Sequence, residues 1–224
     1  MKTAFIHARS KLEVKLPQEV VDLLPKKIGI ATTIQHLSKI KTVLEQLPEA
    51  KLAGQVLGCR SVKDIDADAY LYIGTGVFHP LKIALETEKK VYCYNPESRE
   101  LKEITEKQRR EYKDKIMKSL NIFLNSQNIG VMITTKVGQN FNKIETYSVE
   151  KKLLPLKKLK EKFPDKNFYA IVFDEINETR MEDFNFINCW VNTACSRIAD
   201  RKLKIVNYDE VMELEGSEQL VLRG

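Results

Sequence analysis

The sequence has 224 residues, enough for one large domain or two compact ones, and 43% of its residues are hydrophobic while 30% are charged. The first ten residues, MKTAFIHARS, carry no long apolar core, and no run approaches the ~20 apolar residues of a membrane span, so we expect neither a secretion signal nor a membrane anchor. The net charge of +6 comes from scattered lysines, which is typical of solvated helix faces and argues against direct binding of nucleic acid.

Strands and helices alternate through the first half of the chain. Strands are expected in the apolar segments 27–34, 51–58 (a short strand or a turn), 69–76 and 90–96. Helical spacing of apolar residues predicts helices at 36–47, at 79–87 and, in a long and highly charged segment, at 103–126. Pro80 suits the first turn of its helix, and Pro96 ends the strand before it.

The pattern restarts in the second half, where NIGVMITT (128–135) parallels KIGIATTI (27–34). Further strands are expected at 167–176 and 188–195, and the segment 203–216 closes the chain. Helices are expected at 148–163, which Pro155 should break or kink, and at 180–184.

Near-continuous apolar strands separated by helices imply parallel sheets that are covered on both faces. We therefore predict an α/β protein with two similar three-layer units, mainly parallel sheets, and a long charged helix that joins them. The expected domains are residues 1–124, which include the joining helix, and residues 125–224.

Small and polar residues fall where the predicted strands end, and open α/β sheets bind ligands at that edge. The candidate ligand-binding residues are Gln35, Gly74, Gly76, His79, Gln139 and Arg197. Two simpler interpretations stay open. In the first, the Gly74–Gly76 turn serves only chain reversal, because a lone GxG is a weak signal; in the second, His79 only starts a helix.

The four cysteines form two groups according to the residues around them in the sequence. In the cytoplasm, where we expect this protein, they should be free thiols or metal ligands rather than disulfides. Cys93 and Cys189 lie within apolar strands and are expected to be packed core thiols. Cys59 and Cys195 each end an apolar segment, follow a small residue and precede an arginine, which leaves room at the sulfur and favours the metal-binding thiolate. Their wide separation excludes a local zinc finger or ferredoxin loop.

The motifs GQVLGC, AYLYIGTGVFHP and YNPES, with TTIQH upstream and ACSR downstream, resemble the diphthamide synthase family in order and over nearly the whole chain. The likeness is greatest to its archaeal homodimeric type, 2-(3-amino-3-carboxypropyl)histidine synthase. It implies a transferase that moves a 3-amino-3-carboxypropyl group from S-adenosylmethionine to a histidine of translation elongation factor 2, the first step of diphthamide biosynthesis. It also implies three similar α/β domains, each giving one cysteine to a 4Fe-4S cluster that generates a 3-amino-3-carboxypropyl radical.

Position by position, the resemblance implies that Cys59 and Cys195 are the cluster ligands of the second and third domains. Ser196 stands where the family usually has the proline of Ala-Cys-Pro-Arg. The family's first domain, with its own cysteine, has no counterpart in these 224 residues. We therefore expect a homo- or hetero-oligomer with a chain that supplies this domain. Recruitment of Cys93 or Cys189 as a further ligand, and loss of the cluster with another role kept, stay open as alternatives.

Two other functions remain open from the sequence. The chain could be a non-catalytic accessory or scaffold subunit that binds elongation factor 2 or a nucleotide. The cysteines could instead hold zinc, although a structural zinc site needs four ligands.

Overall fold

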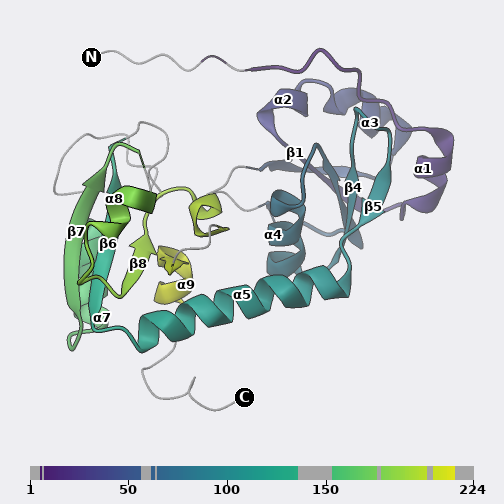
Figure 1. Ribbon diagram of the computed structural model, residues 1–224. Coiled ribbons are helices and arrows are strands. Elements are labelled where there is room, and N and C mark those ends of the chain that lie inside the picture. Colours follow the sequence, from purple (N-terminus) through teal and green to yellow (C-terminus); the bar gives the residue numbers. More distant parts are fainter. Residues whose placement is uncertain are drawn as a thin grey trace. The chain divides into compact units, whose positions relative to one another are not determined.

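The computed structural model describes residues 6, 8–56, 62–63, 65–135, 153–175, 178–200 and 204–214. The chain divides into two compact units, residues 1–112 and 113–224. The division falls inside the long helix α5 (Glu106–Leu124), which runs along the lower part of Figure 1. Its Tyr112 packs in the first unit and its Phe123 in the second, so one helix belongs to both cores.

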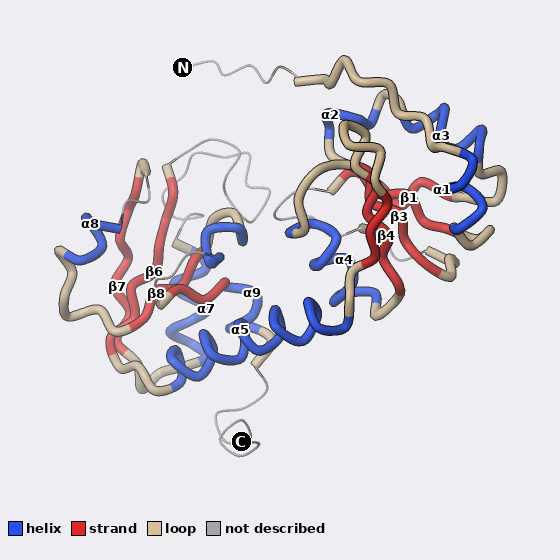
Figure 2. The backbone as a smooth tube through the Cα atoms, turned by 45° about the vertical axis from the view of Figure 1, so that its right-hand side comes forward, coloured by secondary structure: helices blue, strands red, loops and turns tan. Residues whose placement is uncertain are grey.

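In the described part of the first unit, five strands form one sheet in the order β2-β1-β3-β4-β5. These strands are β1 (Ile28–Thr32), β2 (Lys51–Gln55), β3 (Ala69–Ile73), β4 (Lys90–Tyr94) and β5 (Leu101–Glu103). The first four are parallel and β5 is antiparallel to β4. Figure 2 shows the strands of this sheet in red. Every residue of β1 and β3 is buried, as expected for inner strands covered on both faces.

Helices cover both faces of this first sheet (Figure 1). They are α1 (Gln18–Leu23), α2 (Ile34–Leu37), α3 (Ile40–Gln46) and α4 (Phe78–Thr87). Apolar residues of α1 and α3 pack on one face with Ile30 and Leu71, whereas those of α4 pack on the other with Tyr70 and Tyr72. The alternation of side chains along each strand therefore builds two separate cores.

In the described part of the second unit, four parallel strands form a sheet in the order β7-β6-β8-β9. Its elements are β6 (Asn128–Thr134), α7 (Leu154–Lys162), β7 (Asn167–Phe173), α8 (Glu178–Glu182), β8 (Cys189–Asn192), the 3-10 helix η1 (Ser196–Asp200), β9 (Ile205–Asn207) and α9 (Tyr208–Met212). The end of α5 packs with α7 and α9 on one face, and α8 and η1 pack on the other.

The two units share more than a strand order. In each, a glycine of the second strand along the sheet pairs with an aromatic residue of the third: Gly29 with Tyr70, and Gly130 with Trp190. A Cβ atom would lie 2.7 Å from the Tyr70 ring at Gly29 and 2.5 Å from the Trp190 ring at Gly130. The missing side chain leaves room for a large ring in the same place in both sheets.

The predicted fold class is confirmed: two similar α/β units with mainly parallel sheets. The single helix expected at 36–47 is wrong, because α2 and α3 are separate helices interrupted at Ser38 and Lys39. Pro155 neither breaks nor kinks α7, since it lies in the first turn, where a missing N–H costs nothing; residues 148–152 lie outside the described residues. Both α1 and β5 went unpredicted.

Every helix in the described ranges is too short or too polar to cross a bilayer.

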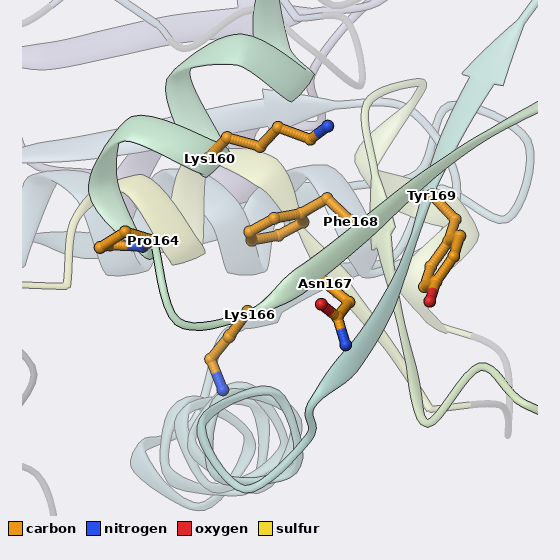
Figure 3. A pocket seen from close by; sticks show the side chains of 6 residues that line it. All are labelled: Lys160, Pro164, Lys166, Asn167, Phe168 and Tyr169. Atoms are coloured by element: carbon orange, nitrogen blue, oxygen red, sulfur yellow. The ribbon is translucent and has the colours of Figure 1, made fainter.

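Lys166, in the turn before β7, ties that turn to the end of α5. Its Nζ donates hydrogen bonds to the carbonyls of Leu124 (2.8 Å) and Ser126 (2.6 Å) and lies 5.3 Å from the centre of the Phe123 ring. Figure 3 shows its side chain directed toward the helix. The carbonyls at a helix C-terminus lack intrahelical partners and favour a cation, so Lys166 caps α5.

We expect Lys166→Met to lower the free energy of unfolding by about 1–3 kcal/mol, because it leaves two carbonyls without their charged donor. Urea denaturation measures the loss. Lys158→Met, at an exposed lysine of α7, is the matched control and should change stability by less than about 0.5 kcal/mol. Equal losses in the two variants would contradict the capping role.

Candidate functional site

The carboxyl ends of β1 and β3 lie side by side in the first unit, because Thr32 pairs with Ile73 in parallel register. The Thr32 hydroxyl donates to the carbonyl of Ile73 at 2.8 Å and links the two ends. Gln35 follows β1 in α2, and after β3 come the turn that holds Gly74 and Gly76 and then His79, in the first turn of α4. The structure therefore brings four predicted residues, Gln35, Gly74, Gly76 and His79, to one edge of this sheet.

The chain leaves β1 and β3 toward opposite faces of the sheet. The segment after β1 leads to α3, which packs on one face, and the segment after β3 leads to α4, which packs on the other. The second unit repeats this arrangement, with α7 on one face after β6 and η1 on the other after β8. Open α/β sheets bind ligands where neighbouring strands send their connections to opposite faces. This topology makes both edges candidate ligand sites.

The glycine turn after β3 has a backbone that requires glycine. Gly74 and Gly76 have φ angles of +153° and +77°, which side chains disfavour. A Cβ on Gly74 would also lie 2.6 Å from the Tyr72 hydroxyl oxygen, whereas no atom of the described residues lies within 4 Å of one on Gly76. Chain reversal thus accounts for both residues, and their role in cofactor binding stays a prediction.

His79 and Gln35 differ in their surroundings. The half-buried His79 ring packs edge-on against Phe78, with centroids 5.3 Å apart, and lies 6.0 Å from the Tyr72 ring. Gln35 is exposed, and its Oε1 accepts a hydrogen bond from the Thr33 hydroxyl at 3.4 Å. These contacts do not show which molecule binds here, but they hold the His79 imidazole and the Gln35 amide at the strand edge.

His36 is a feature of this edge that sequence reasoning did not select. Its side chain is 6% exposed, and its Nδ1 has no hydrogen-bond partner among the described residues. Burial lowers its pKa below the usual 6.5. In the sequence it follows the exposed Gln35 in a short polar stretch, and nothing in that pattern tells which of the two side chains turns inward.

Cys195 lies in the loop after β8, at the carboxyl edge of the second sheet. It is half-buried, and the exposed Arg197 follows in η1. The Thr193 hydroxyl donates to the Met132 carbonyl at 2.6 Å and joins the ends of β8 and β6, as Thr32 joins β1 and β3 in the first unit. The Cys195 carbonyl accepts a hydrogen bond from the Ile198 N–H at 3.0 Å, and this bond forms the first turn of η1.

The other described cysteines are packed thiols. Cys189 is fully buried in the core of the second unit, as predicted, and Cys93 is half-buried and packs against a core of the first. Burial raises the pKa of each thiol to about 12. Since metals bind the thiolate, these two sites disfavour metal binding, whereas the loop position of Cys195 suits it.

Two predicted residues, Cys59 and Gln139, lie outside the described residues. Their placement stays a prediction. Within the parts of the chain that the structure describes, no group of three or more His, Cys, Asp or Glu side chains is arranged to hold a metal ion. Cys195 is therefore one candidate ligand and not a complete metal site.

A hollow of about 360 Å³ lies elsewhere in the second unit (Figure 3). Its lining residues are Lys160, Pro164, Lys166, Asn167, Phe168 and Tyr169. They surround the amino end of β7, the opposite end of the strand from the edge that carries Cys195. The hollow is thus separate from the predicted site.

The fold and the thiol at its strand edge define a class: a protein with two similar α/β units and a candidate metal-binding cysteine. The family described as "Putative diphthamide synthesis protein" matches residues 1–204, and the chain belongs to this family. The resemblance found in the sequence motifs is thereby confirmed.

Two curated relatives are named 2-(3-amino-3-carboxypropyl)histidine synthase. The protein from Methanocaldococcus jannaschii is 33% identical over 176 residues, which are 77% of this chain and 46% of the relative. The protein from Pyrococcus horikoshii is 28% identical over 215 residues, 88% of this chain and 59% of the relative. The chain thus spans about half the length of these relatives.

Solved structures agree with this assignment. The crystal structure of Dph2 from Pyrococcus horikoshii superposes with a TM-score of 0.70 at 26% identity, covering 87% of this chain and 58% of Dph2. The crystal structure of the same protein with a 4Fe-4S cluster gives a TM-score of 0.70 at 25% identity, with the same coverage.

We expect the first unit to lose stability on acidification through His36. Because the folded-state pKa lies below the unfolded value of 6.5, the unfolded chain binds more protons, and stability falls as the pH drops from about 7 through that folded pKa. Unfolding free energies measured across this range should fall less steeply in His36→Leu than in the wild type. Gln35→Leu, at the exposed neighbour of His36, removes no titrating group; it is the control and should keep the wild-type slope. If His36→Leu keeps the wild-type slope, burial of the His36 ring does not lower its pKa in the folded protein, and the prediction fails.

We also expect the cysteines to differ in their reaction with iodoacetamide in the native protein. At about pH 8, Cys195 should be alkylated readily, and Cys189 should stay unmodified because it is buried and its pKa is about 12. Peptide mass spectrometry measures each site, and protein unfolded in urea, where both should react, is the control. Equal modification of both in the native state would refute the assignment.

Proposed function

We propose that this chain serves the transfer of a 3-amino-3-carboxypropyl group from S-adenosylmethionine to a histidine of translation elongation factor 2. Family membership and the names of the relatives support this reaction. The observation that carries it is the placement of Cys195: a half-exposed thiol at the carboxyl edge of a sheet, in a chain similar to a Dph2 that has been crystallised with a 4Fe-4S cluster.

In this proposal Cys195 and Cys59 bind a 4Fe-4S cluster as thiolates. Each thiol gives up its proton on binding, so the affinity for iron should fall at low pH. When bound, the cluster supplies the electron that cleaves the sulfur–Cγ bond of S-adenosylmethionine to give a 3-amino-3-carboxypropyl radical. The chain's own task is to orient the thiolates and to exclude water around them.

The arginine and the polar strand ends have separate tasks. Arg197, an exposed residue two positions after Cys195, is suited to pair with the carboxylate of the methionyl group through its planar guanidinium. In the first unit, the turn at Gly74 and Gly76, together with Gln35 and His79, would hold the remainder of S-adenosylmethionine. Gln139, outside the described residues, is proposed for the same role.

The proposal requires polypeptide beyond these 224 residues. An iron–sulfur cluster of this type is ordinarily held by three or four protein ligands, and the proposal gives it two from this chain. We propose that a further cysteine comes from polypeptide outside this sequence, in a homo- or hetero-oligomer. Elongation factor 2 would be the protein substrate of that assembly.

The test is an iron count on the assembly purified without oxygen from native cells. We expect Cys195→Ser to lose most of its iron, because a hydroxyl is a poor substitute for a thiolate, while Cys93→Ser, a second half-exposed thiol, keeps wild-type iron. Cys59→Ser should behave like Cys195→Ser.

Equal loss from Cys93→Ser and Cys195→Ser would count against the ligand assignment. A wild-type assembly without iron that still binds elongation factor 2 would favour the accessory role. Zinc in place of iron would reject the radical reaction.

A further inference from the structure

One buried side chain holds the loop that carries Cys195. Asn192, the last residue of β8, is 2% exposed. Its Nδ2 donates to the Cys195 carbonyl and to Asn207 Oδ1, both at 2.9 Å, and its Oδ1 accepts from the Ala194 N–H at 3.0 Å. Both amide hydrogens are therefore used. Burying an amide is costly unless it is paired, and here the pairing joins the strand to both sides of the cysteine.

The orientation of Asn192 is set from the neighbouring strand. Asn207 ends β9 and lies opposite Asn192 in register. Its Nδ2 donates to Glu210 Oε1 at 2.9 Å, and its backbone N–H donates to Glu210 Oε2 at 3.1 Å, within the capping box that starts α9. Because the Asn207 Nδ2 is committed to Glu210, its Oδ1 faces Asn192 and accepts the second hydrogen of that amide.

These bonds form one continuous path from α9 to the cysteine: Glu210, Asn207, Asn192, and the backbone at Ala194 and Cys195. The path holds the Thr193–Ala194 peptide group through its N–H and the Cys195–Ser196 peptide group through its carbonyl, so the short stretch of main chain that carries the Cys195 Cα lies between two fixed points. A ligand whose main chain is already ordered loses less conformational entropy when it binds a metal.

We propose that Asn192 is a positioning residue for Cys195, aligned by the Asn207–Glu210 capping box. The positioning of the loop follows from the hydrogen bonds alone, and its purpose, presenting a thiolate to iron, rests on the proposed function.

Two variants and one matched control test this proposal. Asn192→Asp keeps the volume but places an oxygen against two oxygen acceptors, the Cys195 carbonyl and Asn207 Oδ1, and this repulsion moves the carboxylate away from the Ala194 N–H. Asn207→Ser keeps a good helix cap and removes the partner of Asn192, and it still tests the path if Asn192→Asp fails to fold. Thr193→Val, the control, removes a buried hydrogen bond of the same loop that is not part of the path.

The first measurement is the rate of amide hydrogen exchange at Ala194 in the metal-free protein, divided by the rate at the Val131 amide in β6. We expect exchange to rise at least about fivefold in Asn192→Asp and Asn207→Ser, the equivalent of one lost hydrogen bond, and to stay within about twofold of wild type in Thr193→Val. The second is the electron paramagnetic resonance spectrum of the reduced, iron-loaded assembly, which should change in the first two variants and not in the control.

Wild-type exchange in Asn192→Asp or Asn207→Ser would overturn the proposal, and so would an equal rise in Thr193→Val. If exchange responds as expected but the wild-type assembly takes up no iron, the positioning of Cys195 stands and the proposed function fails. If iron is bound and the spectra of all three variants match wild type, Asn192 does not position the cysteine for the metal. The positioning proposal then fails while the proposed function stands.

Discussion

Parallel pairing of strands is the constraint on which the rest of this structure depends. It places all carboxyl ends of β1 to β4 at one edge, as it does for β6 to β9, and it obliges each connection to cross one face of its sheet. The polar residues after the strands gather at that edge as a result. The same constraint buries the strands on both faces, which leaves Cys189 inside the core while Cys195, six residues later, reaches the edge.

Hydrogen bonds from small polar side chains stabilise each edge. Thr32 in the first unit and Thr193 in the second each link the two strands whose connections diverge, and in the second unit Asn192 adds the loop itself. Loops at strand ends are ordinarily the mobile parts of α/β proteins. The threonine hydroxyls hold neighbouring strands together, and the buried Asn192 amide, with its hydrogen bonds made, gives the loop after β8 the rigidity that an oriented ligand requires.

The sequence predicts what depends on periodicity and not what depends on distant partners. Apolar runs located the inner strands, and the restart at residue 128 indicated the second unit. Elements shorter than two helical turns or four strand residues, α1 and β5, carry too few residues for a period to emerge. The inward turn of His36 and the path through Asn192, Asn207 and Glu210 depend on segments that meet only in the folded chain. The position of Cys195 at a strand end was readable from the sequence, and that of Cys59 stays a prediction.

The glycine–aromatic pairs in the two sheets have an evolutionary consequence. Neither Gly29 nor Gly130 can gain a side chain while its ring partner, Tyr70 or Trp190, keeps its size. Each pair is therefore sterically coupled: a side chain at the glycine requires a smaller residue in place of the ring. That the same locked pair recurs at equivalent places in both sheets is what descent of the two units from one duplicated ancestor would leave behind.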